Sequence, residues 1–267
     1  MKYTEYFGMK QNPFSNDLKE KDLLHLPGTL SVKERIDYLL KVGGIMVITG
    51  DVGTGKSTAL RWALSNYHPS EVYSLYVTAN SGSTNELYKQ LCWGINIDIN
   101  TGSRSLLIKK FKDGIRDIIK EQKMKIIVNI DEASLLRPDI FAELHTINQF
   151  NYDSNNLFSL VLAGQNSLLD KLKYRSSAPL ASRVITRSHL TSINEDQMKD
   201  YIKHHLKVVG IKKGLFTDNA ITAIYQGSGG LLRKANSLAR GALIACMINN
   251  DDIVNEEYVR RASTELI

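Results

Sequence analysis

Short apolar runs alternate with longer amphipathic stretches over the first 190 residues of the chain. Runs of β-branched and apolar residues bounded by turn residues predict five strands, at 45–49, 72–77, 125–130, 158–163 and 184–190. Between them apolar positions recur every three or four residues, as over 104–123, which is typical of amphipathic helices. Ser31 with Glu34 and Ser83 with Glu86 match capping boxes that start such helices. This alternation predicts an α/β core with a five-stranded parallel sheet flanked by helices.

After Leu190 the strand patterns stop. The remaining patterns are helical, at 196–208, 218–225, 231–247 and 255–265. Glycines separate these stretches, the clearest being the turn at 227–230. We therefore predict two domains, an α/β core over residues 1–192 and a small all-helical domain over residues 193–267.

Charge and hydropathy narrow the class of protein. The formal net charge is +6, from 34 basic and 28 acidic residues, a mild excess that is compatible with a polyanionic partner. The first residues lack the charged and apolar regions of an export signal, and no window reaches the 18 or so apolar residues that a membrane span needs. We expect a cytoplasmic protein with no membrane segment.

The cysteines and histidines do not predict a metal site. Cys92 and Cys246 lie in apolar helical contexts, which favours buried thiols over a disulfide or a metal pair. His204 and His205 are adjacent on a predicted helix, so their side chains diverge by about 100° and cannot share a metal ion. We expect both histidines at a solvated helix end and predict no zinc site.

A glycine-rich segment between the first predicted strand and the next helix carries the strongest chemical signal. The sequence GDVGTGKS at 50–57 fits G-x-x-x-x-G-K-[ST], a P-loop whose backbone N–H groups surround phosphates. Lys56 would reach the β and γ oxygens of ATP, and the Ser57 hydroxyl would ligate Mg²⁺. The residues that we expect to bind the nucleotide here are Gly50, Asp51, Val52, Gly53, Thr54, Gly55, Lys56, Ser57 and Thr58.

Two carboxylates follow the third predicted strand. Asp131 and Glu132 end the apolar run at 125–130, which places them at the carboxyl edge of the sheet, beside the P-loop. Asp131 would hold Mg²⁺ through water, and Glu132 would orient and deprotonate the attacking water. The alternative is that these acidic residues only start the next helix. Asn129 interrupts the apolar run, so one face of this strand is predicted to be polar.

The order of these motifs resembles the AAA+ ATPases, and the likeness spans nearly the entire chain. The P-loop and Asp131-Glu132 are followed by Ala163-Gly164-Gln165, Ser182-Arg183 and, in the helical part, Gly229-Gly230-Leu231-Leu232-Arg233. With Tyr6-Phe7-Gly8 and Asn12-Pro13-Phe14 near the start, the chain is similar to the ExeA (GspA) branch. That branch includes secretion accessory ATPases and the transposition helpers MuB, TniB and TnsC. The resemblance implies an AAA+ core followed by a helical lid.

The resemblance also implies roles for single residues. Gln165 matches the sensor-1 position, near the γ-phosphate, and a satisfied strand-end amide is the alternative. Arg183 matches the arginine finger that reaches a neighbouring subunit's ATP, with Arg175 and Arg187 as rivals and a solvated arginine as the alternative. Arg233 matches sensor 2, and a surface arginine is again the alternative.

Two further groups are implied less directly. Pro13 and Phe14 match the N-terminal segment that covers adenine in this family, and an ordinary hydrophobic staple is an equal alternative. The cations that family geometry nominates for DNA phosphates are Lys89, Arg104, Lys109 and Lys110. Such a cluster is usually a solvated helix face.

The leading functional hypothesis is a DNA-binding ATPase that oligomerises on duplex DNA as a ring or filament when ATP is bound. It would regulate a transposase and disassemble on hydrolysis. A chain that ends at Ile267 without a membrane span resembles the transposition helpers more than the secretion members. The alternatives are an accessory ATPase for assembly of a secretion or envelope machine, which does not bind DNA, and a nucleotide-gated scaffold with negligible turnover.

Overall fold

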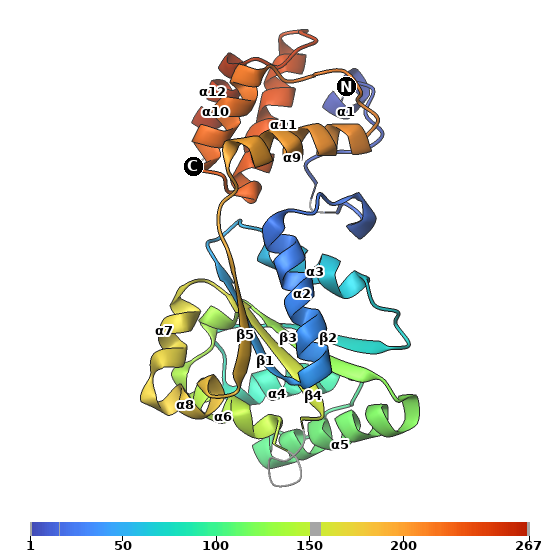
Figure 1. Cartoon of the computed structure of the whole chain (residues 1–267), viewed down its shortest axis with the longest axis vertical. Coiled ribbons are helices and arrows are strands. Elements are labelled where there is room, and N and C mark those ends of the chain that lie inside the picture. The colour runs from blue at the N-terminus through green and yellow to red at the C-terminus, as the bar shows by residue number, and fades with distance from the viewer. Residues whose placement is uncertain (1, 16, 150–155, 266–267) are drawn as a thin grey trace. The chain divides into compact units, whose positions relative to one another are not determined.

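The computed structural model describes residues 2–15, 17–149 and 156–265 (Figure 1). Its five strands are β1 Gly44–Gly50, β2 Val72–Thr78, β3 Lys125–Asp131, β4 Phe158–Gly164 and β5 Val184–Leu190. They form one parallel sheet in the order β2-β3-β4-β1-β5. All five predicted strands and the parallel arrangement are therefore confirmed.

Alternating side chains of the strands point to two different layers of helices. Ile45, Val128 and Leu162 belong to an apolar cluster that also contains residues of α4 (Thr84–Trp93), α5 (Arg104–Gln122) and α6 (Pro138–Ile147). On the other face, Ser159 donates a hydrogen bond from its hydroxyl to the Leu39 carbonyl of α2 (Pro27–Val42), at 3.2 Å. Helix α2 and α3 (Lys56–Ser65) cover that second face, as Figure 1 shows.

The remaining helices are short or belong to the C-terminal part of the chain. The short elements are α1 Tyr3–Tyr6, α7 Ser167–Lys173, α8 Ala178–Ala181 and the 3-10 turns η1 Glu20–Asp22, η2 Ala133–Leu135 and η3 Arg175–Ser177. The C-terminal helices are α9 Glu195–Val208, α10 Asp218–Ser228, α11 Leu232–Ile248 and α12 Glu256–Thr264. Each of the four predicted C-terminal helices is confirmed to within three residues at its ends.

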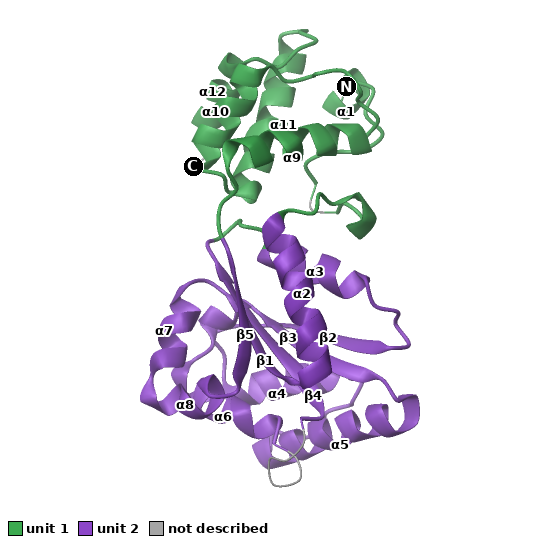
Figure 2. Ribbon diagram, viewed as in Figure 1, with its two compact units in different colours: residues 1–26, 52–55, 191–267 green, residues 27–51, 56–190 purple. Residues whose placement is uncertain are grey.

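The chain folds as two compact units, coloured separately in Figure 2. The sheet unit comprises residues 27–51 and 56–190, and the helical unit comprises residues 1–26, 52–55 and 191–267. The expected boundary near residue 192 lies close to the observed change at 190–191. The first 26 residues differ from the expectation, because they belong to the helical unit rather than to the core.

The N-terminal segment packs in the helical unit through its own apolar side chains and through contacts with two histidines of α9. Phe14 is buried in the apolar cluster of this unit, where it stacks on His205 and meets Phe216 edge-on. His205 is 2% exposed, and its Nδ1 lies 2.7 Å from the Pro13 carbonyl oxygen. His204 contacts the Asp22 carbonyl oxygen through Nε2 at 2.8 Å. The prediction of a solvated helix end is therefore wrong, because the N-terminal segment covers these rings.

Of the two helix starts predicted from capping boxes, one is confirmed and one is wrong. Ser83 caps α4 in a capping box with Glu86, as predicted. Ser31 is not a cap, because α2 already begins at Pro27, whose fixed φ suits a first helical position.

Cys92 and Cys246 are free and buried, as expected. In the part of the chain that the structure describes, none of the helices combines the length and apolar character needed to cross a bilayer.

Candidate nucleotide site

The carboxyl ends of the central strands place the predicted catalytic residues at one edge of the sheet. Strand β1 ends at Gly50, where the P-loop begins, and β3 ends at Asp131. Strand β4 lies between β1 and β3 and ends at Gly164, directly before Gln165. Parallel strands bring these three ends to the same edge, which is where ligands bind in open α/β sheets.

Lys56 lies across the start of the P-loop. Its Nζ donates to the carbonyl oxygens of Gly50 and Asp51, both at 2.9 Å, and the residue is 7% exposed. A buried ammonium is stable only when its donors are paired, and here loop carbonyls supply those partners. The lysine is therefore held at the mouth of the loop, where its charge suits an anionic phosphate.

Two glycines let the loop turn as a phosphate cradle requires. Gly53 and Gly55 have φ values of +88° and +93°, which L side chains rarely adopt. A Cβ on Gly53 would also lie 3.0 Å from the Arg233 Cβ, within the helical unit. The loop conformation thus depends on glycine at these positions of the motif.

Asp131 and Ser57, the two predicted magnesium residues, are in direct contact. The Ser57 hydroxyl donates to Asp131 Oδ2 at 2.6 Å, and Asp131 is 3% exposed. A hydroxyl and a carboxylate are the hard oxygen ligands that Mg²⁺ prefers. The donor set therefore fits Mg²⁺. Tyr76 of β2, which the sequence did not single out, also donates to Asp131 Oδ2, at 2.8 Å.

Glu132 occupies an unusual backbone conformation. Its φ and ψ are 51° and 31°, in the left-handed region that a glutamate adopts at a cost of about 1–3 kcal/mol. The following turn holds this geometry. Lys171 of α7 donates from Nζ to the carbonyl oxygens of Ser134 and Leu136, at 2.5 and 2.7 Å. Strain of this kind clusters at functional sites.

The sensor-1 region contacts the P-loop through the residue after the predicted one. Asn166 Nδ2 donates to Asp51 Oδ1 at 3.0 Å. The Gln165 side chain is exposed, and its backbone amide donates to the Ser134 hydroxyl at 3.3 Å. Asn166 was missed by sequence reasoning, although its position beside Gln165 at a strand end could have suggested it.

The candidate finger arginines differ in how they are held. One guanidinium nitrogen of Arg183 donates to the Pro179 carbonyl at 2.6 Å, and the Arg183 carbonyl accepts from the Ile45 amide at 3.1 Å. Arg175, on η3, and Arg187, on β5, are exposed. Arg183 and Arg187 are thus both tied to the sheet through their backbones, and Arg183 is held through its guanidinium as well.

In the helical unit, Arg233 is the second residue of α11 and lies next to the P-loop residue Gly53. The Arg233 amide donates to the Gly53 carbonyl at 3.2 Å, while the side chain is exposed. Pro13 and Phe14 are both buried. The burial of Phe14 in the apolar cluster of this unit agrees with the hydrophobic-staple alternative.

The cations nominated for DNA are only partly exposed. Arg104 forms an ion pair with Glu143, and Lys110 donates to the Asp98 carbonyl at 3.0 Å. Lys89 is half-buried, whereas Lys109 is exposed. Of the four candidates, Lys109 presents its charge most openly.

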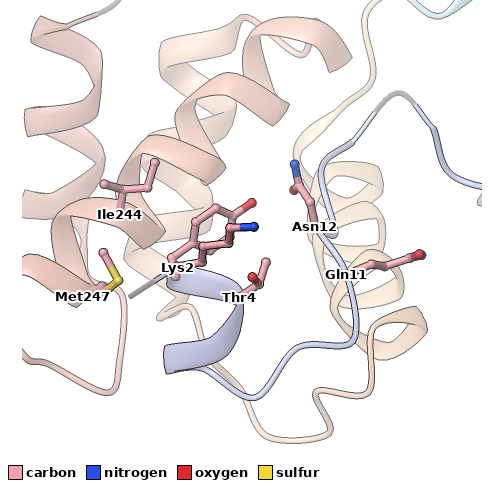
Figure 3. A pocket seen from close by; sticks show the side chains of 7 residues that line it. Lys2, Thr4, Gln11, Asn12, Ile244 and Met247 are labelled. Atoms are coloured by element: carbon pink, nitrogen blue, oxygen red, sulfur yellow. The ribbon is translucent and has the colours of Figure 1, made fainter.

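The helical unit also contains a hollow of about 490 Å³ between the N-terminal segment and α11 (Figure 3). Figure 3 shows Ile244 and Met247 of α11 facing Lys2 and Thr4, with Asn12 on the opposite side. The described residues that line this hollow include no carboxylate. It therefore lacks the donor set of a magnesium-nucleotide site.

Known proteins resemble this chain in sequence and fold. Residues 40–172 match the protein family described as an AAA domain. The chain has the AAA+ fold. General secretion pathway protein A of Aeromonas hydrophila is 29% identical over 246 residues, which cover 91% of this chain and 44% of that protein. The chain thus spans less than half the length of this relative. The 29% identity supports the ExeA/GspA branch of the predicted resemblance.

Solved structures agree on the AAA+ fold. Cdc6p of Pyrobaculum aerophilum matches with a TM-score of 0.76 and 19% identity, over 96% of this chain and 70% of that one. The ORC1 protein of Aeropyrum pernix, solved in complex with DNA, matches with a TM-score of 0.74 and 18% identity, over 95% and 68%. At these identities the likeness concerns the fold alone.

Proposed function

We propose that this AAA+ domain binds ATP with Mg²⁺ and hydrolyses it. The observation that carries the proposal is the hydrogen bond of 2.6 Å between Ser57 Oγ and Asp131 Oδ2. It joins the end of the P-loop to the end of β3, two segments 74 residues apart, and puts the two predicted magnesium residues together. A glycine-rich turn without a ligand would not need this pairing.

Different residues would bind the nucleotide with its metal ion and transfer the proton. Lys56 would exchange its loop carbonyls for phosphate oxygens, and Ser57 with Asp131 would hold the metal ion. When bound, Mg²⁺ neutralises charge on the phosphate oxygens. Glu132, which directly follows Asp131, would take a proton from the attacking water, and Gln165 or Asn166 would orient that water or the γ-phosphate.

We further propose that ATP turnover serves assembly of a secretion or envelope machine. The support is the 29% identity to General secretion pathway protein A, which extends over 91% of this chain. The leading sequence hypothesis, regulation of a transposase, gains no support from this relative. The secretion alternative is therefore the better-supported process, and the protein's partner would be a component of that machine.

The nucleotide proposal is tested by Lys56→Ala. The variant should lose ATP binding, because the phosphates lose the cation that the loop holds for them. Binding of a fluorescent ATP analogue measures this loss. Lys213→Ala, which removes an exposed lysine of the helical unit, is the matched control and should bind as the wild type does. Wild-type affinity in Lys56→Ala would refute the site.

A second candidate function is ATP-dependent binding of duplex DNA. It is favoured by the net charge of +6 and by the exposed Lys109. One or two phosphate contacts in each subunit give weak, salt-sensitive binding, which oligomers on one duplex would strengthen. Lys109→Ala should then lower the slope of log affinity against log salt by about 1 per subunit.

Fluorescence anisotropy with two unrelated duplexes separates the two processes. DNA binding requires affinity that falls with salt, changes little with sequence and collapses when ADP replaces ATP. Lys213→Ala again serves as the charge-matched control. Absence of DNA binding at low salt with ATP and Mg²⁺ would contradict the DNA function and favour the role in assembly of a secretion machine. Equal binding with ADP and ATP would remove nucleotide from the DNA mechanism.

A further inference from the structure

The carboxylate of Asp131 accepts three hydrogen bonds from three different parts of the sheet unit. Oδ1 accepts from the Glu132 amide at 2.8 Å. Oδ2 accepts from the Ser57 hydroxyl at 2.6 Å and from the Tyr76 hydroxyl at 2.8 Å. A carboxylate has about four acceptor positions, so these donors occupy three and leave one on Oδ1.

The position of Tyr76 follows from strand register. Tyr76 of β2 is paired with Asn129 of β3, and Asn129 lies two residues before Asp131 on the same face of the sheet. An aromatic side chain is long enough to reach that next position along the neighbouring strand. A phenol hydroxyl can donate whereas a carboxylate can only accept, so Tyr76 is the donor in its bond to Asp131.

We propose that Tyr76 is a positioning residue for the magnesium site. The inference rests on the proposed binding of Mg²⁺ with ATP. An aspartate carboxylate rotates easily about its terminal torsion, and each hydrogen-bond donor restricts that rotation. The Tyr76 hydroxyl fixes the plane of the Asp131 carboxylate. Asp131 in turn orients the Ser57 hydroxyl, and its remaining Oδ1 position would be available to accept from a water of the bound metal ion.

A purely structural role for Tyr76 is the alternative, and Tyr73 provides the matched comparison on the same strand. The Tyr73 hydroxyl donates to the Gly94 carbonyl at 3.0 Å, on the opposite face of β2. The Tyr73 and Tyr76 hydroxyls therefore donate hydrogen bonds of similar length, but only Tyr76 contacts Asp131. Tyr76→Phe and Tyr73→Phe remove the same atom from different surroundings.

The test is the magnesium dependence of nucleotide binding. Fluorescent ATP analogue binding is titrated with Mg²⁺, and Mn²⁺ binding in the presence of ATP is followed by EPR. Removing a residue that orients a metal ligand typically weakens metal affinity 10- to 100-fold, so we expect a loss of about 10-fold for Tyr76→Phe. Affinity for the nucleotide in EDTA should stay within about twofold of wild type, and Tyr73→Phe should change neither value.

Turnover adds a readout that a structural defect would not give. Tyr76→Phe should regain a wild-type kcat at saturating Mg²⁺, because the defect lies in metal affinity. An unchanged Mg²⁺ midpoint in Tyr76→Phe, or a kcat that stays low at saturating Mg²⁺, would overturn the positioning role. If the wild type itself shows no Mg²⁺-dependent nucleotide binding, the proposed function fails first, so the two failures are distinguishable.

Discussion

The sheet unit and the helical unit handle buried polar groups in different ways. In the sheet unit Lys56 and Asp131 are buried and pair with P-loop atoms, at the edge where three strands end. In the helical unit His205 is buried among aromatic rings, and its Nδ1 meets the Pro13 carbonyl. The first arrangement gathers groups that can exchange their partners for a ligand. The second ties a chain segment in place.

The pKa of His205 shows how its surroundings affect protonation. Burial lowers it from 6.5 to about 4. Nε2 of His205 is buried without a hydrogen-bond partner among the described residues, so a proton added there would be poorly solvated. The helical unit therefore contains a buried group that favours the neutral state, whereas the buried polar side chains of Lys56 and Asp131 in the sheet unit have hydrogen-bond partners.

The largest expected effect concerns Arg183 of the sheet unit, the residue that we predict to be an arginine finger. Arg183→Ala should leave ATP binding intact and lower turnover by roughly 10³-fold, since its guanidinium would neutralise charge on a neighbouring subunit's γ-phosphate. Phosphate release measures the loss. Arg175→Ala is the matched control, because this exposed arginine is not anchored to the sheet.

Mixing variants tests whether Arg183 acts between subunits. Arg183→Ala subunits combined with Glu132→Gln subunits should recover part of the activity at shared interfaces. Absence of recovery at every ratio would contradict a finger acting in trans. A large loss in Arg175→Ala with normal turnover in Arg183→Ala would transfer the role to Arg175.

The next expected effect is smaller and concerns how the stability of the helical unit depends on pH. Because the folded pKa of His205 lies below the unfolded value, the unfolded chain binds more protons between pH 6.5 and 4. The contribution of His205 to stability is fully present above pH 6.5 and is lost as the pH falls towards 4. The free energy of unfolding should drop by up to about 3 kcal/mol across that window.

Urea denaturation at several pH values measures this drop. Both tryptophans, Trp62 and Trp93, lie in the sheet unit, so their fluorescence reports that unit while far-UV circular dichroism reports both. His205→Phe should be less stable at pH 7 but show a flatter pH profile. His204→Asn, which changes the neighbouring histidine, should keep the wild-type slope. An equal slope in His205→Phe would contradict the assignment.

The sequence predicts the fold well where signals are local. The five strands, the C-terminal helices and the Ser83 cap follow from periodicity and capping chemistry within short windows. The Ser31 prediction failed because Pro27, four residues earlier, already starts α2. The burial of His205 could not be predicted from α9 alone, because a segment almost 200 residues away in sequence covers it.

The same division holds for the nucleotide site. The P-loop and Asp131-Glu132 are contiguous motifs, and their residues meet as their spacing predicts. Tyr76, Asn166 and Lys171 were missed, because their contacts depend on strand register and on the packing of α7 against a turn. A tyrosine on the strand that pairs with the Asp131 strand is a weak signal, since register must be known before it has meaning.

The most direct test of the account is ATP turnover by Glu132→Gln. This substitution preserves the shape of the side chain and removes the base, so binding of ATP with Mg²⁺ should be unchanged. Phosphate release should fall by about 10²- to 10⁴-fold, the usual contribution of a general base. The wild type should hydrolyse ATP under the same conditions. Equal rates of phosphate release by the wild type and Glu132→Gln would contradict the central claim.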